Sequence, residues 1–129
     1  MKDEALLKAS GAMTGGIGGM ADACGSLIGA GLILGAVCGL GRKDGDKGMP
    51  KLGESIKQAG DFYKWFKDKQ GLTSCREIVT KFGNGVFYDF GIPEQAKAGT
   101  EAGVLEKCNV LVEDNCAKVV ELLWDSLHK

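Results

Sequence analysis

The cysteines are the residues of this sequence whose type and spacing suggest chemistry. The chain holds five: Cys24, Cys38, Cys75, Cys108 and Cys116. Three of them, Cys24, Cys75 and Cys108, fall at the predicted start of a helix. The positive end of a helix dipole lowers the pKa of a thiol placed there and favours its thiolate form. Thiolates bind metal ions and iron–sulfur clusters, so these three residues are a candidate ligand set.

A second interpretation of the cysteines stays open, because free cysteine is a common and chemically inert core residue. We interpret Cys38 and Cys116 in this way. Cys38 lies about 21 Å along the same predicted helix from Cys24, so the two thiols cannot meet. The number of cysteines is odd, which rules out complete internal disulfide pairing. The sequence contains no C-x-x-C, C-x-x-C-H or paired zinc-ribbon spacing, so covalent haem is not expected.

Other functional classes find little support in the sequence. The formal net charge is −1, which does not suggest nucleic acid or an anionic membrane as a partner. The only histidine, His128, is next to the last residue, so a histidine-activated nucleophile is not expected. The Gly15–Gly19 segment matches neither a dinucleotide-binding nor a P-loop fingerprint. The first residues are charged in both signs and lack the pattern of a secretory signal, so we expect a cytoplasmic protein.

The elements that must position the cysteines are all predicted to be helical. We expect one all-α domain, residues 1–129: a small multi-helix bundle around a buried, glycine-rich central helix. Predicted helices cover residues 2–10, 23–41, about 50–70, 75 to about 83, one turn near 92–95, and 108–127.

Local signals mark several helix ends. Asp22 is predicted to cap the central helix, which would put Cys24 in its first turn. Pro50 suits a first helical turn, and Gly71 suits the residue after a helix. Ser74 followed by Glu77 is a capping-box pattern, which makes Cys75 the first residue of its helix. The last helix is predicted from one apolar stripe, which is Val112, Cys116, Val119, Val120, Leu123 and Leu127.

The central segment, residues 23–41, carries no charge and approaches the length of a membrane span. We interpret it as a core helix, because its glycines dilute the hydrophobicity and no aromatic belt flanks it. Its small-xxx-small spacings, such as Gly25 with Gly29 and Gly31 with Gly35, predict a helix crossing at short distance. The crossing partner is either another helix of this chain or the same helix of a second subunit, which would make a homodimer.

The order of these motifs resembles a known family. The pattern S-G-x-x-x-G-G-I-G, then C-G-S-L-I-G-A, S-C-R-E-I and C-x-x-L-V-E-D is similar to that of the redox-active family named for its C_GCAxxG_C_C motif. A related cysteine-bearing domain of split-Soret cytochrome c looks similar. The resemblance covers about Leu6 to Leu123. It implies a small all-helical domain with four characteristic cysteines, a redox role, iron–sulfur binding, and an association with transporters.

Carried over by position, the resemblance implies that Cys24, Cys75 and Cys108 are ligands and that Gly25 and Gly29 are the motif glycines beside the cofactor. Ser26 stands where the family has alanine. The family's first cysteine belongs to a helix that would precede Lys2, and it has no counterpart in this sequence. A fourth ligand would then come from a different residue type, from Cys38, from Cys116 or from a partner chain, unless the site has degenerated.

Three functions follow from these observations. The first is a redox or electron-transfer protein that holds an iron–sulfur cluster, or another thiolate-bound metal, at Cys24, Cys75 and Cys108. The second is a metal-free thiol–disulfide or sensing protein in which Cys24 is the attacking thiolate. The third is a non-catalytic helical interaction module that assists a membrane transporter, with the cysteines in the core.

Overall fold

The computed structural model describes residues 3–128, and the described chain is all-α, as predicted. Its elements are the helices α1 (Glu4–Gly11), α2 (Gly25–Cys38), α3 (Met49–Gln70), α4 (Cys75–Phe82), α5 (Pro93–Glu101) and α6 (Val104–Leu127), with a short 3₁₀ helix η1 (Gly45–Gly48) before α3. Lys2, which we placed in the first helix, lies outside the described residues. The helical turn predicted near 92–95 is a full helix, α5.

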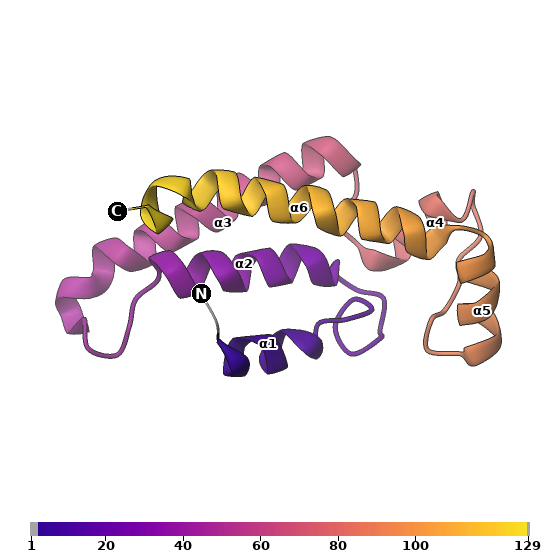
Figure 1. The fold of residues 1–129 in the computed structure, drawn as a ribbon, viewed down its shortest axis with the longest axis horizontal. Coiled ribbons are helices and arrows are strands. Elements are labelled where there is room, and N and C mark those ends of the chain that lie inside the picture. Colours follow the sequence, from indigo (N-terminus) through magenta and orange to yellow (C-terminus); the bar gives the residue numbers. More distant parts are fainter. Residues whose placement is uncertain (1–2, 129) are drawn as a thin grey trace.

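The three long helices α2, α3 and α6 lie side by side and enclose the core (Figure 1). α2 and α6 run in the same direction, and α3 runs in the opposite one. An ion pair of 3.1 Å between Lys69 and Asp114 ties the end of α3 to the middle of α6. The parallel course of α2 and α6 puts their N-terminal ends at the end of the bundle where α4 lies. The core cluster is Ala30, Leu34, Phe62, Phe66, Ile78, Leu111, Val119 and Leu123.

Local signals set the ends of α3 and α4 as predicted. Pro50 lies in the first turn of α3, where a backbone N–H would have no partner within the helix, so the proline costs no hydrogen bond. Gly71 ends the helix in the left-handed conformation, with φ of 76°. Ser74 caps α4 by accepting a hydrogen bond from the amide of Glu77, and Cys75 is the first helical residue. These three predictions are therefore confirmed.

The glycine-rich helix α2 packs on both α3 and α6 and buries Ala30 and Leu34. Within residues 3–128, no helix crosses α2 at short distance at Gly29, Gly31 or Gly35, and the alternative, a crossing by a second subunit, stays a prediction. A Cβ added at Gly29, Gly31 or Gly35 would meet no atom within 4 Å. The helices approach α2 on its Ala30–Leu34 face, so these glycines stay on the open side.

The start and the buried face of α6 both differ from the prediction. The helix begins at Val104, four residues before Cys108, because Gly103 breaks the chain in the left-handed conformation with φ of 82°. Its buried residues are Val104, Leu111, Asn115, Val119 and Leu123. Of the predicted stripe, Val112, Val120, Leu127 and Cys116 are exposed. Cys116 is therefore not a core residue, whereas Cys38 packs against the core as expected.

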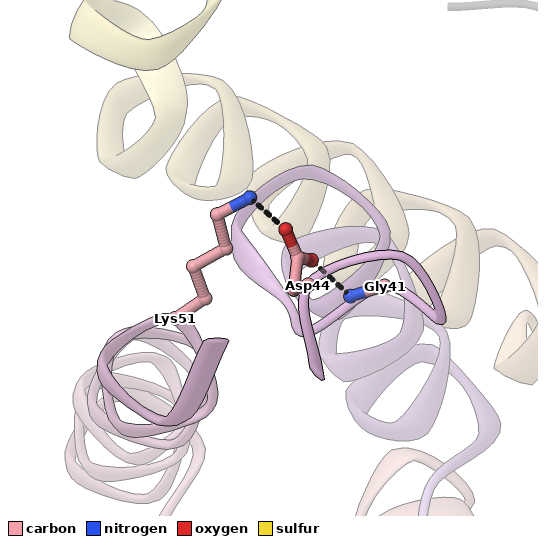
Figure 2. A network of polar contacts seen from close by, with 3 residues as sticks. All are labelled: Gly41, Asp44 and Lys51. Atoms are coloured by element: carbon pink, nitrogen blue, oxygen red, sulfur yellow. Dashed lines mark hydrogen bonds and ion pairs between the residues drawn. The ribbon is translucent and has the colours of Figure 1, made fainter. Parts of the chain in front are cut away.

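The connection between α2 and α3 is held by the carboxylate of Asp44 (Figure 2). Asp44 accepts a hydrogen bond of 2.7 Å from the Lys51 ammonium and one of 2.6 Å from the amide of Gly41. Both contacts stabilise the charged form, Lys51 more strongly, and hold the pKa of the Asp44 carboxyl below its usual range. This clamp fixes the turn that lets α3 fold back along α2.

None of the helices in residues 3–128 combines the length and the apolarity needed to cross a membrane.

The packing of α2 makes a direct prediction about stability. Leu34 is 0% exposed and Leu32 on the same helix is 37% exposed, so Leu32 is a matched control of the same residue type. Leu34→Ala should lower the free energy of unfolding by about 2–5 kcal/mol, because it leaves a cavity among core side chains. Leu32→Ala should lower it by less than about 1 kcal/mol. Urea unfolding followed by circular dichroism measures both values, and equal losses would contradict the placement of the core.

Candidate thiol site

A glycine-rich loop, residues 12–22, leads from α1 to the first candidate cysteine. The five consecutive residues Gly15–Gly19 all have positive φ, and Ala21 does too. Glycine adopts this conformation at little cost, whereas a β-branched residue such as Ile17 is strained in it. The left-handed turn is closed by hydrogen bonds of 2.8 Å from the Ala21 amide to the Gly15 carbonyl and 3.0 Å from the Asp22 amide to the Gly16 carbonyl. The loop therefore folds back on itself before Cys24.

The end of this loop pairs with the segment that precedes α4. Ala23 and Ser74 form an isolated antiparallel bridge. The Cys24 amide donates to the Thr73 carbonyl at 2.9 Å, and the Cys75 amide donates to the Asp22 carbonyl at 2.5 Å. In such a pair Cys24 and Cys75 are diagonal neighbours on one face, and diagonal α-carbons lie roughly 7–8 Å apart. The pairing thus brings together two cysteines that are 51 positions apart in the sequence.

The third cysteine arrives from α6. Lys107, its neighbour in the sequence, donates a hydrogen bond of 3.0 Å to the Phe82 carbonyl at the end of α4. This bond fixes the first turns of α6 against α4. The charges of Cys75 and Cys24 both influence the Cys108 thiol, which places the three thiols within electrostatic reach of one another.

Two of the three cysteines do not sit as predicted at their helix starts. Cys24 itself is the N-cap of α2, and it makes no side-chain capping bond. Asp22 does not cap this helix, and its carbonyl is instead taken up by the Cys75 amide. Cys108 lies in the second turn of α6, since that helix starts at Val104. Only Cys75 occupies the first helical position as expected.

At Cys75 and Cys108 the electrostatics oppose the expectation that a helix dipole lowers the pKa of the thiol. Burial raises the pKa of Cys75, and the nearby Cys24 raises it further, while Arg76 acts in the opposite direction. Burial, together with the charges of Cys75 and Cys24, raises the pKa of Cys108 to about 11. At these two sites the free-energy cost of removing a thiolate from water is larger than the stabilisation that the helix dipole provides. At neutral pH these two thiols are therefore protonated.

The motif glycines differ in their surroundings. A Cβ at Gly25 would collide with the carbonyl oxygen of Met13, so the loop packs directly on the first turn of α2. Gly29 lies one turn further on and lines an open groove of about 580 Å³ between α1 and α2, together with Leu6, Leu7, Leu32 and Ile33. Gly25 therefore has a packing role beside Cys24, and Gly29 faces the groove.

One polar residue near the site escaped the sequence analysis. Asn115 is 2% exposed, and its Nδ2 donates a hydrogen bond of 2.7 Å to the Ser26 hydroxyl in the first turn of α2. Its Oδ1 has no hydrogen-bond partner among the described residues. A periodic pattern of apolar residues does not reveal a buried amide. Only the position of Asn115 seven residues after Cys108, on the same face of the helix, could have indicated it.

Within residues 3–128 no set of three histidine, cysteine or acidic side chains is already arranged to hold a metal ion. The five cysteines are free thiols. The three site cysteines are thus close enough to influence one another electrostatically without forming a closed coordination sphere.

The fold and the site define a small all-α protein with a cluster of thiols drawn from three distant segments. The family described as "Putative redox-active protein (C_GCAxxG_C_C)" matches residues 1–122. The match spans nearly the whole chain, and the protein belongs to this family. Comparison with curated proteins and with solved structures gives no match.

The raised pKa of Cys108 predicts how this thiol reacts. With a pKa of about 11 instead of 9.0, the thiolate fraction at pH 8 is about a hundredfold smaller than that of an ordinary thiol. Alkylation with iodoacetamide, read peptide by peptide by mass spectrometry, should therefore modify Cys108 far more slowly than the exposed Cys116. The Cys108 rate should keep rising between pH 9 and pH 11. A Cys108 rate that is already at its plateau at pH 9 would contradict this assignment.

Proposed function

We propose that the protein is a redox protein whose working group is held by the thiolates of Cys24, Cys75 and Cys108, and that this group is an iron–sulfur cluster or another thiolate-bound metal. The observation that supports the proposal is that Cys24 and Cys75 lie close enough to Cys108 for their charges to act on its thiol. Burial raises the pKa of Cys75 and Cys108, and the neighbouring thiolates raise it further, so a positive charge is needed to hold the thiolates together at neutral pH. A bound metal provides that charge.

The donor set fits such a group by its chemistry. Thiolates select iron–sulfur clusters, zinc and copper(I) over harder ions, and the three thiols are half-buried, which favours a soft metal over water. When bound, an iron–sulfur cluster supplies one-electron transfer. The protein's own part is to hold the ligands. The 21–24 and 73–76 segments fix Cys24 and Cys75, and the contact of Lys107 with Phe82 fixes Cys108.

The three cysteines leave a fourth ligand to be assigned. Cys38 ends α2, and Cys24 caps the start of the same helix, so Cys38 lies about a helix length away, on the order of 20 Å. Cys116 lies two turns beyond Cys108 and is exposed. Neither cysteine extends the cluster, which favours a non-cysteine ligand or a ligand from a partner chain.

The proposal also includes the binding partners of the protein. A homodimer through α2 is consistent with the open space beside Gly29, Gly31 and Gly35 and with the partial exposure of Leu32 and Ile33. An electron partner, a transporter association and a cytoplasmic location are expectations from the family resemblance and from the sequence.

Metal analysis of protein purified without oxygen tests the proposal. The wild type should contain stoichiometric iron and sulfide, with charge-transfer bands in its visible spectrum. Cys24→Ser, Cys75→Ser and Cys108→Ser should each abolish most of the metal, because each removes one thiolate ligand. Cys38→Ser and Cys116→Ser are the matched controls and should keep it. Stoichiometric metal in the triple Cys24/Cys75/Cys108 serine variant would overturn the assignment.

A metal-free thiol–disulfide function is the second candidate, and the diagonal placement of Cys24 and Cys75 favours it. A disulfide needs α-carbons about 4.4–6.8 Å apart, which is less than the roughly 7–8 Å of diagonal neighbours, so the two segments would have to move closer together. In this reaction the Cys24 thiolate attacks a disulfide of a partner protein, and one partner sulfur leaves as a thiolate. Cys75 then gives up its proton and attacks the mixed disulfide. The Cys24–Cys75 bond forms, the second partner sulfur leaves, and the partner is reduced by two electrons.

Oxidation of metal-free protein distinguishes this candidate. Treatment with oxidised glutathione should give a disulfide between Cys24 and Cys75, seen as a cross-linked peptide pair by mass spectrometry without reduction. Cys75→Ser should instead leave Cys24 as a mixed disulfide with glutathione, because the resolving thiol is missing. Cys116→Ser, which removes an exposed thiol away from the pair, is the control. Random pairing among all five cysteines would count against a dedicated redox pair.

A further inference from the structure

Gly16 lies in a narrow contact between the glycine-rich loop and the thiol site. A Cβ added at this position would lie 2.7 Å from the Cβ of Cys75, 2.6 Å from the Asp22 amide nitrogen and 2.9 Å from the Ala21 carbonyl carbon. Non-bonded carbon atoms pack at about 3.5–4.0 Å, so all three separations are too short. Its φ of +74° also belongs to the left-handed region. Only glycine therefore lets the loop lie directly against Cys75.

The same loop also occupies the first amides of α4. The Cys75 amide donates to the Asp22 carbonyl at 2.5 Å, and the Arg76 amide donates to the Ala21 carbonyl at 3.1 Å. The next amide, that of Glu77, donates to the Ser74 hydroxyl. The first amides of a helix have no partner within the helix and normally bond to water, to capping side chains or to ligands. Here the loop takes two of them and covers the Cβ of Cys75 at the same time.

We propose that Gly16 is a positioning residue for Cys75: the missing side chain at position 16 sets how closely the loop covers Cys75 and so how far its thiol is shielded from water. This inference deepens the proposed function, since it concerns one of the three candidate ligands. Gly16 has no side chain that could bind the proposed group, and it acts through its contact with Cys75 and with the backbone of residues 21–22. Cys75 is half-buried, which is consistent with this cover.

The loop offers a matched control. Gly19 has φ of +76°, almost equal to that of Gly16, yet a Cβ there would meet no atom within 4 Å. Gly16→Ala and Gly19→Ala therefore bear the same cost of a left-handed alanine. Only Gly16→Ala pushes against Cys75, so the loop must shift away from α4 in that variant alone.

The experiment measures the alkylation rate of each cysteine in the reduced full-length protein at pH 8, with a chelator present. In Gly16→Ala the displaced loop should uncover Cys75, and its rate should rise severalfold because the reagent reaches the thiol more easily. The Cys116 rate should not change. Gly19→Ala should leave Cys75 at the wild-type rate. Urea unfolding should show a larger loss of stability in Gly16→Ala, because the clash adds to the cost of a left-handed alanine that both variants bear.

An unchanged Cys75 rate in Gly16→Ala, or an equal rise in both variants, would overturn the inference. Hydrogen exchange in the wild type provides a second test, which does not require Gly16→Ala to fold. The Cys75 and Arg76 amides should be protected although they open a helix, and exchange as fast as in an unfolded chain would overturn the inference too. Both readouts use metal-free protein. A wild type that binds no metal would therefore refute the proposed cofactor and leave this test of Gly16 intact.

Discussion

The short antiparallel pairing between residues 21–24 and residues 73–76 is the contact on which the thiol site depends. It joins the exit of the glycine-rich loop to the entry of α4, and it sets the relative positions of Cys24 and Cys75 through backbone hydrogen bonds. Backbone bonds of this kind do not depend on side-chain rotamers, so the geometry is firmer than surface side chains would give. The core formed by α2, α3 and α6 then fixes the two segments against the third cysteine. Without the pairing, α2 and α4 would share no bond at the site.

Two opposing effects determine the state of the thiols. Helix starts stabilise negative charge by about 0.3–1 kcal/mol at exposed sites. Burial and the neighbouring thiolates disfavour the same charge, and at Cys75 and Cys108 they prevail. The dipole is further weakened at α4, because the Asp22 and Ala21 carbonyls point at its first amides. The arrangement thus shields the thiols while it brings them together.

The sequence predicted those parts of the fold that depend on local signals, and it failed where distant contacts decide. The Ser74 cap, Pro50 and the left-handed Gly71 act within one turn of the chain, and all were predicted. Asp22 has the side chain of a good cap, but its backbone is engaged by Cys75 from far along the sequence. The buried face of α6 includes Asn115, which an apolar stripe cannot reveal. The grouping of Cys24, Cys75 and Cys108 came from the family pattern and from their helix starts, and the structure brings the three within electrostatic reach.

The protonation of the site bears on the choice between its two candidate functions. In the thiol–disulfide candidate, Cys75 must give up its proton to resolve the mixed disulfide formed by Cys24, and burial raises the pKa of Cys75 and so slows this second step. A metal removes this difficulty, because it replaces the thiol protons and balances the repulsion among the sulfurs in one step. Metal binding should then release protons and strengthen as the pH rises. The same burial that slows thiol exchange would also shield a bound cluster from water, and it is one of the factors that tune a cluster's potential. The surroundings of Cys75 and Cys108 are thus compatible with the proposed bound group and slow the chemistry of free thiols.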